Sequence, residues 1–342
     1  MSEKTKILHI ATGGTIAMAS DADGAMAAID STSDLLAMVP EVKSFADVHF
    51  KQLKSVDSAN ISPPDWLDIA DIIVKNYNDF DAFVITHGTD TMAYTAAALS
   101  FFLLELDKPV ILTGSQIAIS VIGSDGKRNL VNAFRVACSD LAEVAIVFGS
   151  SIIRGVRARK ISAFSLEAFD SINENALGEI GLSVRLSRSR AQRKNGRRLL
   201  YTPTLNKDVA LVTIYPGFKE SYLQHIIDTH SGVVLLGYGT GNIPSGDNDG
   251  LLKIIKNASE KGIPVIVGTQ CVLGSTNLGM YRVGKSVLEA GGIPSVDMTP
   301  EAAFVKLMWV LGQTDKMERI TSMMLKNWVG EISGNFDTWT KD

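Results

Sequence analysis

The chain has 342 residues, enough for one large domain or two of ordinary size. With 46% hydrophobic and 20% charged residues, it has the composition of a globular protein with a sizeable core. Its formal net charge of −4 comes from 33 basic and 37 acidic residues, which leaves no overall basic excess, so we do not expect nucleic acid as a partner.

Cysteine usage and hydropathy bear on the compartment. Cys138 and Cys271 form no CxxC pair, which favours a reducing compartment with both thiols free. The most apolar helical stretch, residues 93–106, is too short to span a membrane and carries Glu105. The apolar stretch after Lys6 loosely resembles a signal peptide, but we interpret it as the first strand of the mature protein. We therefore expect no membrane partner.

Strand and helix signals alternate through the first half of the chain. The clearest helix start is Ser62, a capping residue followed by two prolines and by Asp65 near the positive end of the helix. Strands separated by single helices indicate a parallel sheet with right-handed crossovers. In chain order the predicted elements are a strand at 7–10, a helix from 62, a strand at 82–85, a helix at 91–105, a strand at 109–112, a helix at 129–141 and a strand at 144–148.

A second α/β pattern follows a region of weak periodicity. Residues 188–207 are predicted to be a linker between an N-terminal domain, 1–187, and a C-terminal domain, 208–342. Most of a basic cluster at 185–198 lies in this linker, and a solvated connector is favoured over a phosphate or acidic-partner site. Strands are predicted at 209–214, 233–236 and 264–267, and an amphipathic helix at 300–311, with helical signals to 324. The fold class is thus two α/β domains: a larger N-terminal one with a mainly parallel sheet and a smaller C-terminal one with a parallel sheet.

Two of the predicted strands run into glycine turns that carry threonines. Thr15 follows Gly13 and Gly14, and residues 86–91 form the polar run Thr-His-Gly-Thr-Asp-Thr. Ligands of open α/β sheets bind at the carboxyl ends of strands, so both turns are expected at one crevice. Thr15 as a simple cap and Asp90 as a helix N-cap are the structural alternatives.

Several familiar site motifs are absent from the sequence. The turn after the first strand lacks the GxGxxG spacing of dinucleotide sites, and Gly126-Lys127 is followed by arginine rather than by the Ser or Thr of a nucleotide-binding loop. There is no GxSxG elbow and no HExxH zinc motif. No cofactor and no metal are therefore predicted.

Ser58 and Lys160 are further candidates for the crevice. Ser58 lies between an extended segment and the helix capped by Ser62, and Lys160 follows a strand. Taken alone, Ser58 would be a turn serine and Lys160 a surface lysine.

Together these segments resemble the bacterial-type L-asparaginase family over nearly the whole chain, and most of all its type I, cytoplasmic members. Residues 12–16 (Thr-Gly-Gly-Thr-Ile) and 87–91 (His-Gly-Thr-Asp-Thr) are similar to the two family signatures. Type I character is seen in further segments: 92–96, 108–111, 113–117, 124–126, 215–217 and 269–271.

The resemblance implies a cofactor-free hydrolysis of L-asparagine to L-aspartate and ammonia. Thr15 would be the nucleophile, with Thr89, Asp90 and Lys160 as the second catalytic group. Ser58 would bind the substrate α-carboxylate and Asp90 its α-ammonium. The pocket would also be lined by Asp57, Ala59, Gly88 and Ser115. The family also implies a homodimer or homotetramer with sites near a subunit interface.

The implied chemistry needs an activated hydroxyl and a stabilised oxyanion. A lysine acts as a base only where burial disfavours its charged form, while a nearby carboxylate favours that form. We therefore expect Lys160 to be buried and its proton to be shared with Thr89 and Asp90.

Two positions depart from the family pattern. Ala25 stands where the family has a loop tyrosine that helps to activate the nucleophile. Thr269 and Cys271 match the allosteric asparagine site of type I enzymes, but Leu236 replaces its arginine, which removes a charge-assisted bond. Weak or absent cooperativity is expected.

Four alternatives remain open from the sequence. An enzyme of broader glutaminase-asparaginase specificity is one, because one methylene in a pocket is worth only about 1–3 kcal/mol; a preference for D-asparagine is equally open. The ammonia-supplying subunit of the tRNA-dependent amidotransferase carries the same signatures with an added N-terminal domain, for which we expect no room before the first strand. A non-catalytic amino-acid sensor would explain Ala25, but would not need both Thr15 and Lys160.

Overall fold

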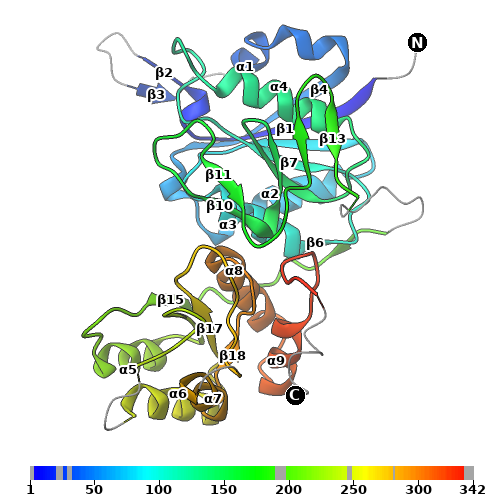
Figure 1. The fold of residues 1–342 in the computed structure, drawn as a ribbon. Coiled ribbons are helices and arrows are strands. Elements are labelled where there is room, and N and C mark those ends of the chain that lie inside the picture. Colours follow the sequence, from blue (N-terminus) through cyan, green and yellow to red (C-terminus); the bar gives the residue numbers. More distant parts are fainter. Residues whose placement is uncertain are drawn as a thin grey trace. The chain divides into compact units, whose positions relative to one another are not determined.

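The computed structural model describes residues 4–20, 26–28, 33–188, 198–244, 249–279 and 282–334, with the backbone alone at 17–20, 26–28, 33–34 and 282–283. The chain divides into two compact units (Figure 1). One comprises Met1–Ser171 and Asn175–Thr202, and the other Ile172–Glu174 and Pro203–Asp342. The predicted linker boundaries stay a prediction, and most of the basic cluster lies outside the described residues.

An eight-stranded sheet forms the centre of the first unit, in the order β13-β12-β9-β8-β7-β5-β1-β4. Its five strands from β8 to β4 are parallel, and β9, β12 and β13 pair antiparallel at the other edge. The mainly parallel sheet expected from the sequence is thus confirmed. The strands are β1 (Thr5–Gly13), β4 (Ala46–Val56), β5 (Ala82–Thr86), β7 (Val110–Thr113), β8 (Val144–Phe148), β9 (Ser151–Arg154), β12 (Gly178–Ile180) and β13 (Val184–Leu186).

Helices cover both faces of this sheet, which explains why β5, β7 and β8 are buried along their whole length. On one face Leu130 and Phe134 pack with Ile7, Val84 and Ile111 in a continuous apolar core. α2 and α3 lie on the opposite face (Figure 1). The helices of the unit are α1 (Ser33–Ala37), α2 (Pro63–Lys75), α3 (Met92–Phe102) and α4 (Gly126–Ala137).

Short elements complete the first unit. Helix α3 ends earlier than predicted, because Leu103–Leu104 form β6 and pair with β14 (Leu200–Tyr201), a distant segment that local periodicity does not report. The other short strands are β2 (Met18–Ser20), β3 (Met26–Ala28), β10 (Ala158–Lys160) and β11 (Phe169–Ser171). Single 3-10 turns occur at Thr15–Ala17, Pro40–Ser44, Ser58–Asn60 and Gly155–Arg157.

The second unit has a four-stranded parallel sheet in the order β15-β16-β17-β18. Leu223, Ile255 and Val287 pack from three helices onto Val233 and Val265 of this sheet. The strands are β15 (Val209–Thr213), β16 (Gly232–Gly237), β17 (Val265–Thr269) and β18 (Ile293–Pro294), and the helices are α5 (Glu220–Thr229), α6 (Gly250–Glu260), α7 (Arg282–Glu289), α8 (Pro300–Leu311) and α9 (Met317–Leu325). In the described part of the chain, no helix is both long and apolar enough to cross a membrane.

Candidate functional site

The candidate site is built at the carboxyl ends of four adjacent strands. Gly13, the last residue of β1, pairs with Val56 at the end of β4. On the other side of β1, Ala11 pairs with Thr86, the last residue of β5, and Thr86 pairs with Thr113, the last residue of β7. The four loops that follow these strands therefore leave the sheet at one edge, where ligands of such sheets bind.

Two glycines bring the threonine loops into direct contact. Gly14, with φ +86°, lies so close to the second loop that a Cβ on it would be 2.4 Å from the Gly88 nitrogen. A Cβ on Gly88 would in turn be 2.6 Å from Cβ of Ser58. Only glycine allows these approaches, so the three loops carrying Thr15, Ser58 and Thr89 meet at one point. Thr15 itself is half-buried and begins the 3-10 turn after β1.

Ser58 is held against the Thr89 loop by two hydrogen bonds. Its Oγ accepts from the backbone nitrogen of Asp90 at 3.3 Å, and its carbonyl accepts from Thr91 Oγ1 at 2.8 Å. The side chain is buried. Because Ser58 Oγ accepts from Asp90, its own hydroxyl proton remains available for a ligand.

Lys160 reaches the same point from a separate hairpin. It is the last residue of β10, which pairs antiparallel with β11. Its Nζ donates to Thr89 Oγ1 at 2.8 Å and to Asp90 Oδ1 at 2.6 Å. The Lys160 side chain is 20% exposed and that of Asp90 is 64% exposed. The expected contacts are present, whereas the expected burial of Lys160 is only partial.

His87 holds the Thr89 loop in place through two hydrogen bonds. Its Nδ1 lies 2.7 Å from the carbonyl oxygen of Gly88, which can only accept, so Nδ1 carries the proton. Its Nε2 then accepts from Thr95 Oγ1 at 2.9 Å. Burial lowers the pKa of His87 to about 4, so the imidazole is neutral near pH 7.

Ser115 follows β7 and is buried at the same edge. Its Oγ has no hydrogen-bond partner among the described residues. A buried hydroxyl without a protein partner is a natural contact for a polar ligand. The loop is fixed beside it by the Asp125 carboxylate, which accepts from the backbone nitrogens of Gln116 and Ile117 at 3.0–3.1 Å.

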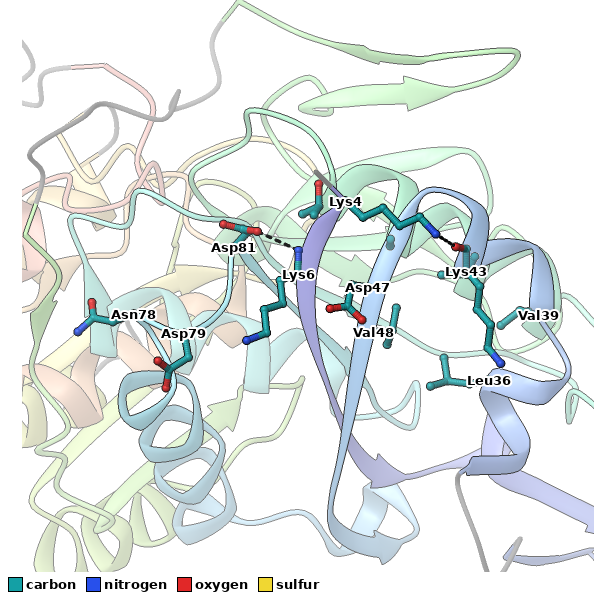
Figure 2. A pocket seen from close by; sticks show the side chains of 13 residues that line it. Lys4, Lys6, Leu36, Val39, Lys43, Asp47, Val48, Asn78, Asp79 and Asp81 are labelled. Atoms are coloured by element: carbon teal, nitrogen blue, oxygen red, sulfur yellow. Dashed lines mark hydrogen bonds between the residues drawn. The ribbon is translucent and has the colours of Figure 1, made fainter. Parts of the chain in front are cut away.

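A cavity lies at the opposite end of β1 and β4. It has a volume of about 860 Å³, and its lining includes Lys4, just before β1, together with Lys6 of β1 and Asp47 of β4 (Figure 2). Lys6 donates its backbone N–H to Asp81, and Lys4 donates to the carbonyl of Lys43. Because Thr15 follows the other end of β1, this cavity is separate from the candidate site.

Comparison with known proteins places the chain in a family. Residues 6–192 match the family model "Asparaginase, N-terminal", and residues 208–324 match that of the "Glutaminase/Asparaginase C-terminal domain". The chain belongs to the asparaginase family. The resemblance inferred from the two signature motifs is thereby confirmed.

Individual members of the asparaginase family match almost the full chain. L-asparaginase 1 of Escherichia coli is 37% identical over 338 residues, which are 97% of this chain and 99% of that protein. A subunit of the glutamyl-tRNA(Gln) amidotransferase of Pyrococcus horikoshii is 38% identical over 346 residues, 97% of this chain and 78% of that protein. The solved structure of the thermostable L-asparaginase from Thermococcus kodakarensis superimposes with a TM-score of 0.91 at 37% identity, covering 96% of this chain and 99% of that one.

Other residues predicted from the asparaginase resemblance lie in different parts of the structure. Asp57 and Ala59 flank Ser58 and are exposed, and the Asp57 carboxylate accepts from the Ala59 nitrogen as a local cap. Thr269 and Cys271 belong to the second unit, where the Thr269 hydroxyl donates to the carbonyl of Gly239 and accepts from the Cys271 nitrogen. Ala25 lies outside the described residues.

Two polar residues at this edge have no role implied by the asparaginase signatures. Gln116 contacts Thr89, and His87 contacts Gly88. Both lie in segments that carry the resemblance, 87–91 and 113–117, but nothing in the sequence assigns either side chain a role.

Proposed function

We propose that this protein is an L-asparaginase that hydrolyses L-asparagine to L-aspartate and ammonia without a cofactor. The observation that carries the proposal is the pair of bonds from Lys160 Nζ to Thr89 Oγ1 and Asp90 Oδ1. The contact between Gly14 and Gly88 supports it, because it puts the loop of Thr15 beside this group.

In the first half-reaction the Thr15 hydroxyl attacks the carboxamide carbon of asparagine and loses its proton. The C–N bond then breaks, and the amide nitrogen leaves as ammonia after taking up a proton, with an ester to Thr15 left behind. In the second half-reaction water attacks the ester carbon, which releases aspartate and returns a proton to Thr15. Thr89 and Lys160 serve proton transfer and charge stabilisation in both halves.

Substrate recognition follows from the polar groups around the attacking hydroxyl. Ser58 Oγ has a proton to donate to the α-carboxylate, and the exposed Asp90 carboxylate keeps an oxygen for the α-ammonium. Asp57, Ala59, Gly88 and the unpartnered hydroxyl of Ser115 line the rest of the pocket. We further propose a cytoplasmic homodimer or homotetramer.

Ammonia release from L-asparagine, L-glutamine and D-asparagine tests the proposal. The parent is expected to release ammonia from L-asparagine, and Thr15→Ala is expected to lose that activity. Thr204→Ala, which removes a threonine hydroxyl in the second unit, is the control. Full activity in Thr15→Ala would show that Thr15 is not the nucleophile. Ala25→Tyr, which restores the tyrosine of the family pattern, shows whether that position limits turnover.

Other outcomes of the same assay identify the alternatives. Similar rates with asparagine and glutamine would indicate the broader glutaminase-asparaginase. Asparagine binding without ammonia release would indicate a sensor. Ammonia release that depends on an added tRNA-amidotransferase partner would indicate the role named for the Pyrococcus horikoshii relative.

A further inference from the structure

Gln116 links the proposed catalytic group to the loop that follows Lys160. The residue lies just after β7, next to Ser115. Its Oε1 is 3.2 Å from Thr89 Oγ1, and its Nε2 is 3.3 Å from the carbonyl oxygen of Ser165, between β10 and β11. One amide thus contacts two of the segments that build the site.

The partners of Gln116 allow a single arrangement of hydrogens. The Ser165 carbonyl can only accept, so the amide must present its NH₂ there and its oxygen to Thr89. The amide oxygen can likewise only accept, so the Thr89 hydroxyl donates to it. Lys160 donates to the same Thr89 oxygen. The Thr89 proton therefore points toward Gln116 and away from Lys160.

The backbone of Gln116 is itself held rigidly. Its N–H donates to both oxygens of the buried Asp125 carboxylate, at 3.1 and 3.0 Å. Asn129 Nδ2 donates to Asp125 Oδ2 at 2.9 Å and to the carbonyl of Gly114 at 3.0 Å. A side chain anchored in this way can hold a neighbouring hydroxyl in one orientation.

We propose that Gln116 is a positioning residue that fixes the direction of the Thr89 hydroxyl proton, an inference that rests on the proposed asparaginase activity. While the Thr89 hydroxyl donates to Gln116 Oε1, the Thr89 oxygen keeps a lone pair for an N–H or O–H donor in the pocket. The donor is the substrate carboxamide in the first half-reaction and the attacking water in the second. Loss of Gln116 frees the Thr89 side chain to change rotamer and its hydroxyl proton to turn, and lowers kcat more than it changes KM.

The test compares Gln116→Glu with Gln116→Met across pH. Above the pKa of the new acid, its carboxylate faces the Ser165 carbonyl and is repelled. Below that pKa, the protonated acid donates to Ser165 and accepts from Thr89, as the amide does. The ratio of variant to parent kcat is expected to be about one tenth at pH 8, the value of one hydrogen bond, and to rise for Gln116→Glu only as the pH falls toward the pKa of the new acid, about 4.3 for an unperturbed glutamate. Gln116→Met keeps a low ratio at all pH values.

A merely structural role would give the two variants the same pH-independent ratio, and that result, like parent-like kcat in Gln116→Met, overturns the proposal. Gln313→Glu is the matched control, because the Gln313 amide also bonds a threonine hydroxyl, that of Thr204, in the second unit. Its kcat ratio is expected to stay near one across pH.

Crystal structures of the parent and of Gln116→Met separate this inference from the proposed function. An inactive parent would refute asparaginase activity, whereas the position of Thr89 can still be compared. The Thr89 side chain is expected to change rotamer or to lose its 2.8 Å contact with Lys160 in Gln116→Met. A Thr89 side chain that keeps both overturns the positioning role whether or not the parent releases ammonia.

Discussion

Gly14 lies so close to Gly88 that a Cβ on Gly14 would be 2.4 Å from the Gly88 nitrogen. The backbone of Gly14 also has φ +86°, a conformation that side chains rarely adopt. The two threonine loops are therefore joined through backbone, and the spacing of Thr15 from Thr89 depends on a residue without a side chain.

Gly14→Ala is expected to abolish most asparaginase activity and to lower the free energy of unfolding by about 1–3 kcal/mol. The new methyl group must push the loops apart, and the backbone around it cannot yield as a flexible side chain could. Gly217→Ala is the matched control: Gly217 has φ +87° but nothing within 4 Å of an added Cβ. A Gly14→Ala enzyme as active as Gly217→Ala would show that the contact between the loops does not matter for turnover.

Lys160→Met is expected to lower kcat/KM by roughly a hundredfold or more, the usual contribution of a general acid or base. The substitution removes both bonds to Thr89 and Asp90 but keeps most of the side-chain volume. Thermal unfolding should shift little, because the side chain is partly exposed. Lys75→Met, which breaks the exposed 3.2 Å pair with Asp71, is the control and should leave turnover unchanged.

Acid is expected to destabilise the fold through His87. Burial lowers its folded pKa from 6.5 to about 4, so the unfolded state binds more protons between these values. Stability is therefore fully present above pH 6.5 and is lost as pH falls toward 4, by up to about 3 kcal/mol. Denaturant unfolding from pH 7 to pH 4 should show a shallower decline in His87→Gln, where a neutral amide replaces the imidazole.

The exposed His225→Gln is the control for that measurement. His9 contributes in the same direction, because burial lowers its pKa to about 3. The parent therefore keeps part of its acid sensitivity in the His87 variant, and a His87→Gln profile identical to the parent's would contradict the assignment.

The positions of the two threonine loops at one edge of the sheet could be predicted from local signals. The glycine before Thr15 and the run around Thr89 both follow apolar strands, and parallel strands bring their carboxyl ends to one edge. The Ser62 helix start was also local: Ser62 is the N-cap of α2, and its backbone nitrogen donates to the Asp65 carboxylate at 2.8 Å. Gln116 could not be assigned in this way, because its role depends on the carbonyl of Ser165, 49 positions later.

Tertiary contacts also override local pattern in the second unit. The segment of α8 was predicted to be amphipathic, yet Lys306 in it is fully buried. Its partner is Glu331, beyond the following helix. A lysine within an apolar run gives no indication of such a partner until the chain has folded back.

Lys306 and Glu331 form a buried ion pair in which every polar atom has a partner. Lys306 Nζ lies 2.6 Å from Glu331 Oε1 and donates to the carbonyls of Met324 and Lys326 at 2.8 and 2.7 Å. The Glu331 carboxylate also accepts from the backbone nitrogens of Trp328 and Val329. Burial lowers the pKa of Lys306, against the attraction of Glu331.

Lys306→Met is expected to lower the free energy of unfolding by about 3–5 kcal/mol, because it leaves the Glu331 carboxylate buried without a counter-charge. The double variant Lys306→Met/Glu331→Gln should recover part of this loss, since a neutral amide can still accept from the backbone nitrogens at that position. A double-mutant cycle measures the free energy of unfolding by denaturant for the parent, Lys306→Met, Glu331→Gln and the double variant. Strictly additive effects would mean that the two charges are not coupled, and would refute an ion pair that fixes the last described segment onto α8.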